Sequence, residues 1–109
     1  MATLTEIPVT VSADAAARVA ELGMQREFQM MIDQLKQIIP GLRAIEATLE
    51  YPPDYEDEPA VLLTTVQPPP AQEVDPTRHG WRSWFVENFP PDVLRHFVRL
   101  PFYEAGNGR

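Results

Sequence analysis

The chain has 109 residues, which is enough for one small domain and too few for two ordinary ones. Apolar residues make up 44% of it and charged residues 23%, so a wholly disordered chain is excluded. Acidic residues outnumber basic ones by 16 to 9, and the net charge of −7 argues against nonspecific binding of nucleic acid, whose phosphates attract Lys and Arg.

The first third of the chain predicts an edge strand followed by a long helix. Apolar residues alternate with polar residues or proline over 7–12, and Pro8, which has no N–H to donate, places this strand at a sheet edge. Ser12 is a typical N-cap for the helix that follows. Apolar side chains then recur every three or four residues, which predicts one long helix over 13–39 or, if it breaks at Gly23, two shorter ones.

Two further strands are predicted in the middle of the chain. Residues 43–51 alternate between apolar and polar side chains, as in a strand with one face in water. Residues 60–66 are rich in β-branched side chains and alternate less, so this strand is expected to be more buried. The prolines and acidic residues of 52–59 predict an exposed loop that joins the two strands into a hairpin.

Two short helices are predicted near the C-terminus. Aromatic residues at helical spacing from Trp81 to Phe89 predict the first, which ends at Pro90. Apolar side chains between Pro91 and Pro101 predict the second.

These elements together predict one α+β domain over residues 1–103, with a flexible tail over 104–109. The domain is expected to have a small antiparallel-rich sheet of about three strands, packed by one long N-terminal helix, with two short C-terminal helices (β-α-β-β-α-α). No cysteine is present, and no motif for a metal, phosphate or nucleophile occurs, so we expect no cofactor and no bound metal. Because neither a bilayer-spanning stretch nor a secretory signal is found, we expect a cytoplasmic protein.

Two groups of residues have the composition of protein interfaces, where aromatic side chains and arginine are enriched. The predicted hairpin loop supplies an acidic, tyrosine-containing group: Tyr51, Tyr55, Glu56, Asp57 and Glu58. The C-terminal part supplies an aromatic and arginine group: Trp81, Arg82, Trp84, Arg95 and Arg99.

We therefore expect a non-enzymatic module that binds a protein partner of basic character, as an inhibitor, an immunity or antitoxin-like factor, or an accessory subunit does. The length of the helix over 13–39 and its methionine residues also predict a homodimer that forms through this segment. The alternative is a small-molecule-binding or enzymatic domain with a pocket near His79 and His96, the two histidines of the chain.

A further alternative rests on the N-terminal third of the chain. The stretch Ile-Pro-Val-Thr-Val-Ser, followed by a helix, Leu22-Gly23 and a second helical stretch, resembles a ribbon-helix-helix DNA-binding domain. The resemblance implies that strands of two chains pair and present Pro8, Thr10 and Ser12 to the DNA major groove. None of these positions is basic, so binding of DNA is the third hypothesis after a protein partner and a small molecule.

Overall fold

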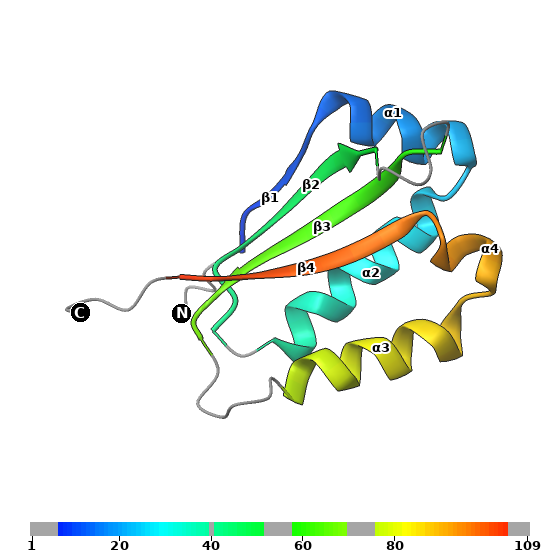
Figure 1. The fold of residues 1–109 in the computed structure, drawn as a ribbon. Helices are drawn as coiled ribbons and strands as arrows, with labels where there is room; N and C mark the ends of the chain where they lie inside the picture. Colours follow the sequence, from blue (N-terminus) through cyan, green and yellow to red (C-terminus); the bar gives the residue numbers. More distant parts are fainter. Residues whose placement is uncertain (1–6, 40, 52–57, 70–75, 105–109) are drawn as a thin grey trace, which may run out of the picture.

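The computed structural model describes residues 7–39, 41–51, 58–69 and 76–104, which form an α+β fold (Figure 1). Its elements follow one another as β1 (Val9–Val11), α1 (Ala13–Leu22), α2 (Gln25–Ile38), β2 (Ala44–Glu50), β3 (Ala60–Gln67), α3 (Pro76–Asn88), α4 (Pro91–Leu94) and β4 (Phe97–Tyr103). The predicted α+β class is confirmed, but the sheet has four strands rather than about three.

The strands lie in the order β1-β2-β3-β4, with two parallel pairs joined by one antiparallel pair. β1 runs parallel to β2, with Val9 opposite Ile45, and forms one edge of the sheet, as Pro8 predicts. β3 runs parallel to β4, with Val61 opposite Phe97. The sheet is therefore mixed rather than antiparallel-rich, because each edge strand reaches its neighbour through a helical crossover.

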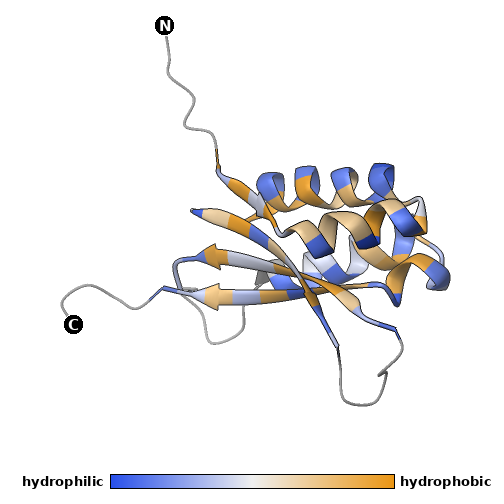
Figure 2. Cartoon of the chain, turned by 90° about the horizontal axis from the view of Figure 1, so that it is seen from above, coloured by the Kyte–Doolittle hydropathy of each residue, from blue (hydrophilic) through white to orange (hydrophobic). Residues whose placement is uncertain are grey.

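The helices of both crossovers lie on the same face of the sheet, as the view from above shows (Figure 2). The strands of the β1–β2 pair run opposite to those of the β3–β4 pair, because β2 and β3 are antiparallel. Both crossovers lead to the next strand in the same direction across the sheet. Two right-handed crossovers would therefore place their helices on opposite faces. One of the two connections is therefore left-handed, which is uncommon. This topology leaves the second face of the sheet uncovered by the described helices.

The predicted long helix is broken in two at Gly23. The side chain of Ser12 accepts a hydrogen bond from the N–H of Ala15 at 3.2 Å, which confirms the predicted N-cap of α1. Gly23 adopts a left-handed conformation with φ of 69°, and its N–H and that of Met24 donate to carbonyls of the last turn of α1. This arrangement is a Schellman-type helix end, and it starts α2 in a new direction.

Residues 97–100 were predicted to belong to the second C-terminal helix, ending at Pro101, but residues 97–103 form the strand β4. The helix ends after one turn as α4, and the strand then pairs along its whole length with β3. Phe97 is 2% exposed at the start of the strand, and its ring stacks on that of Phe28 in α2, with 6.2 Å between ring centroids. Pairing with β3 therefore provides hydrogen-bond partners for the backbone of this segment. It also places the first side chain of the strand, Phe97, in the core.

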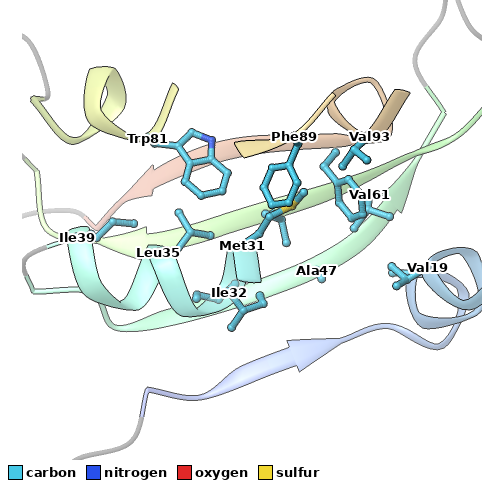
Figure 3. Close-up of a cluster of buried hydrophobic side chains, with 14 of the residues drawn as sticks. Val19, Met31, Ile32, Leu35, Ile39, Ala47, Val61, Trp81, Phe89 and Val93 are labelled. Atoms are coloured by element: carbon cyan, nitrogen blue, oxygen red, sulfur yellow. The ribbon is translucent and has the colours of Figure 1, made fainter. Parts of the chain in front are cut away.

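One hydrophobic core fills the space between the helices and the sheet. Figure 3 shows Met31 and Leu35 of α2 and Trp81 of α3 gathered over the strands with Val61 and Phe89. Met31, Leu35 and Val61 have no exposed surface. The part of the predicted apolar stripe that lies on α2 is therefore used inside the chain, whereas Ala17 and Ala20 on α1 are exposed.

Candidate interaction surface

The alternation of side chains divides the sheet into a core face and an open face. The core face packs against the helices and carries Ile45, Ala47 and Leu63, each at most 1% exposed. The open face carries the even-numbered residues of the strands, which are Thr10, Ala44, Glu46, Thr48, Glu50, Ala60, Leu62, Thr64, Val66, Val98, Leu100 and Phe102. No helix among the described residues packs on this open face (Figure 2).

The β3 and β4 half of the open face is apolar except for Thr64. We call its five apolar side chains, Leu62, Val66, Val98, Leu100 and Phe102, the apolar strip. Leu62 lies opposite Val98, and Val66 lies opposite Phe102, so the strip spans both strands, with Thr64 between its two β3 side chains. Val98, Leu100 and Phe102 are 48%, 51% and 57% exposed. A band of neighbouring apolar side chains at the surface is typical of an interaction site.

The β2 part of the open face is acidic. Glu46 and Glu50 are exposed on it, and we call them the acidic flank. Glu46 lies opposite Thr64, which in turn lies opposite Leu100 of the apolar strip. Glu50 lies opposite Ala60, which precedes Leu62 on β3. Adjacent strands are about 4.8 Å apart, so the acidic flank borders the strip at Glu46 and continues past its Leu62 and Val98 end at Glu50.

The free edge of β4 is unsuited to pairing with another strand. The N–H of Val61 donates to the carbonyl of His96, and the N–H of Glu104 donates to the carbonyl of Gln67. Backbone groups alternate along a strand, so the even-numbered residues of β4 point toward β3 and Pro101 points toward the free edge. Proline has no N–H to offer there, a common protection of edge strands.

The structure places the aromatic residues of the predicted C-terminal group in and around the core. Trp81 is 6% exposed and stacks on Phe85, with 5.0 Å between ring centroids, and Trp84 is half-buried beside them. Arg82 and Arg95 are exposed. The tryptophans thus contribute packing, and partner binding through this group stays a prediction.

Arg99 points to the core face rather than to the open face. Its Nε donates to Thr65 Oγ1 at 3.3 Å, and its Nη2 donates to Gln67 Oε1 at 2.8 Å. Thr65 and Gln67 are buried, at 0% and 4% exposed. Arg99 therefore joins a polar cluster beneath the sheet, which satisfies two buried side chains.

Only part of the predicted hairpin group lies within the described residues. Tyr51 follows β2 and is 62% exposed, and Glu58 is exposed shortly before β3. Tyr55, Glu56 and Asp57 lie outside the described residues.

His96 is buried, at 7% exposed, between α4 and β4. Burial lowers its pKa below the ordinary value. The positive charges of Arg95 and Arg18 lower the pKa further, while Glu58 and Asp92 act in the opposite direction. The neutral imidazole is therefore favoured in the folded protein.

The structure does not bring the two histidines together. His79 is exposed near the start of α3, about 13 Å along the helix from its end. His96 lies beyond that end, past α4. An open hollow of about 380 Å³ lies elsewhere, beside α1 and the end of β2, and neither histidine is among its lining residues, which are Asp14, Ala17, Arg18, Glu21, Leu49, Tyr51 and Pro59.

The N-terminal elements differ from what a ribbon-helix-helix domain implies. β1 pairs in parallel with β2 of the same chain, and Val9 and Val11 pack against the core. β1 thus pairs with β2 of its own chain, and binding of DNA stays a prediction.

The apolar strip was missed by the sequence reasoning, although a signal for it exists. Val98, Leu100 and Phe102 alternate with Arg99 and Pro101, which is the period of a strand. The apolar residues between Pro91 and Pro101 also fit the spacing of a helix, and the helix was predicted instead of the strand.

The described part of the chain contains no helix long and apolar enough to cross a membrane and no cluster of His, Asp and Glu that could hold a metal ion. Comparison with protein-family models, with curated proteins and with solved structures finds no match to this chain.

Proposed function

We propose that this protein is a non-enzymatic interaction module that binds another protein through the open face of its sheet. The observation that carries the proposal is the apolar strip: Val98, Leu100 and Phe102 are about half exposed on a face that no described helix covers. Exposed apolar side chains cost free energy in water, and a partner that buries them recovers about 25 cal/mol for each Å².

The charge of the chain favours a different protein over a second copy. Two copies face to face would bring their acidic flanks into one interface, and each chain carries a net charge of −7.

An inhibitor, an immunity or antitoxin-like factor, or an accessory subunit would use such a face, since each acts by covering a surface of its target. The predicted homodimer through residues 13–39 stays a separate prediction. Met31 and Leu35 of this segment are fully buried within the chain, so they offer no surface to a partner copy.

A pair of matched variants tests the proposal. Leu100→Glu places a charge in the apolar strip, and Val86→Glu places the same charge on α3, where Val86 is 55% exposed. Both side chains are exposed, so both variants are expected to fold with nearly unchanged melting temperatures. We expect a stoichiometric complex purified with the wild-type chain to persist with Val86→Glu and to be lost with Leu100→Glu.

The complex is identified by mass spectrometry and its mass is measured by light scattering. Survival of the complex in Leu100→Glu would contradict the proposal. So would a finding that the strip is covered by a second copy of this chain.

A further inference from the structure

We infer that the partner presents an amphipathic helix whose apolar side covers the apolar strip and whose one basic flank lies along Glu46 and Glu50. This inference rests on the proposed function and adds the shape and charge of the partner. It follows from the dimensions of the strip, the blocked edge of the sheet and the position of the acidic flank.

The strip has the dimensions of one helix. It is two strands wide, about 10 Å, and its β4 side chains extend over about 13 Å from Val98 to Phe102. An α-helix with its side chains is about 10 Å across, and about 12 residues of it span 18 Å. One helix of three turns therefore covers the strip, whereas a wider surface would overhang it.

An added strand is a poor alternative occupant. Pro101 faces the free edge of β4, and the opposite edge strand, β1, has only three residues, Val9–Val11. Neither edge offers a long run of free backbone groups. The partner must then bind through side chains on the open face, which is how a helix packs on a sheet.

The charge of the face selects a basic flank on only one side of the helix. Glu46 and Glu50 lie on the β2 side of the strip, and β4 on its other side is the last strand of the sheet. No Lys or Arg is found among the open-face residues of the four strands. Arg43, which precedes β2, is paired with Glu104 at 3.4 Å.

The spacing of the acidic flank sets the spacing of the partner's basic residues. Glu46 and Glu50 are four residues apart on one face of a strand, which is about 13 Å. Residues seven apart on a helix share one side and are about 10.5 Å apart, and the long side chains of Lys and Arg close the difference. The partner helix is therefore expected to carry basic residues about one heptad apart.

Three synthetic helical peptides of equal length test this inference by fluorescence anisotropy against the full chain. The first has an apolar stripe and one flank with two Lys seven residues apart, the second has Glu in place of these Lys, and the third keeps the Lys but has Ser and Gln in the stripe. We expect only the first to bind well, and its affinity should fall as salt is raised. NMR amide shifts should change on β2, β3 and β4 and not on the helices.

Variants of the chain then test the role of the acidic flank. Glu46→Gln with Glu50→Gln is expected to weaken binding of the first peptide about 2- to 30-fold, as the loss of two exposed ion pairs would. The matched control, Asp33→Asn with Glu87→Gln, removes two exposed acids from the helical side and should leave the affinity unchanged.

The outcomes separate this inference from the proposed function. If the Lys and Glu peptides bind the strip equally, the basic flank is wrong while the open face remains the binding surface. If no peptide binds, or if binding is mapped to the helices, the helical partner is wrong. Self-association that Leu100→Glu abolishes would show a second copy as the occupant and overturn both.

Discussion

Leu62 and Leu63 are neighbours on β3 that point to opposite faces of the sheet, and truncating each of them tests whether one face is open. Leu63 is fully buried. Leu63→Ala removes three carbon atoms worth about 0.8 kcal/mol each, or about 2.4 kcal/mol of transfer free energy. A residual cavity of about 70 Å³ adds about 1.7 kcal/mol, so the expected loss is about 4 kcal/mol.

Leu62 is half-buried on the open face, and its truncation leaves no enclosed cavity. Because only about half of the Leu62 side chain is removed from water, Leu62→Ala is expected to lose about half of the transfer free energy of Leu63→Ala, or about 1 kcal/mol. The two variants change the same residue type in the same strand, so differences in strand propensity cancel. The free energy of unfolding is measured by urea titration, with the fluorescence of buried Trp81 as the probe.

Equal losses for the two variants would refute the reasoning, because they would show that the second face is covered in solution. A loss at Leu62 that grows with protein concentration would identify the cover as another copy of the chain.

Two further changes test the helix junction and the buried histidine. Gly23→Ala is expected to destabilise the protein by about 1 kcal/mol because φ at Gly23 is 69°. Gly80→Ala, within α3 and with open space around it, should stabilise the protein by up to about 1 kcal/mol. Thermal unfolding of both variants measures the difference. The pKa of His96 is lowered in the folded state, so the unfolded chain binds more protons, and the free energy of unfolding should fall as the pH drops below about 6.5. Urea titrations at several pH values measure this pH dependence. We expect it to be reduced in His96→Gln and kept in His79→Gln.

Much of the local structure could be predicted because it depends on neighbouring residues. The alternation over 43–51 predicted β2, the β-branched residues of 60–66 predicted β3, and Ser12 predicted the start of α1. The break at Gly23 was left open, because the roughly 1 kcal/mol cost of glycine in a helix is too small to decide between one helix and two. The Schellman-type end decided it through hydrogen bonds to the preceding turn.

The binding surface could be predicted only in part. Residue composition favoured Trp81 and Trp84 as contact residues, but large aromatic side chains serve a small core equally well, and the structure places Trp81 there. Exposure depends on which side of an element faces the rest of the fold. The spacing of apolar residues around Phe97 and Leu100 fitted both a helix and a strand. It therefore did not show which of these side chains face the core and which face solvent.

The sequence by itself determined an acidic α+β chain with an edge strand at Pro8, a capped helix at Ser12 and a central hairpin, because proline, caps and alternation act over a few residues. Only the tertiary structure decided that residues 97–103 form a strand, since their partner β3 lies more than thirty residues earlier in the chain. It also decided that the helices share one face. That choice depends on the hand of two crossovers, which no local pattern encodes, and it is what leaves the apolar strip exposed.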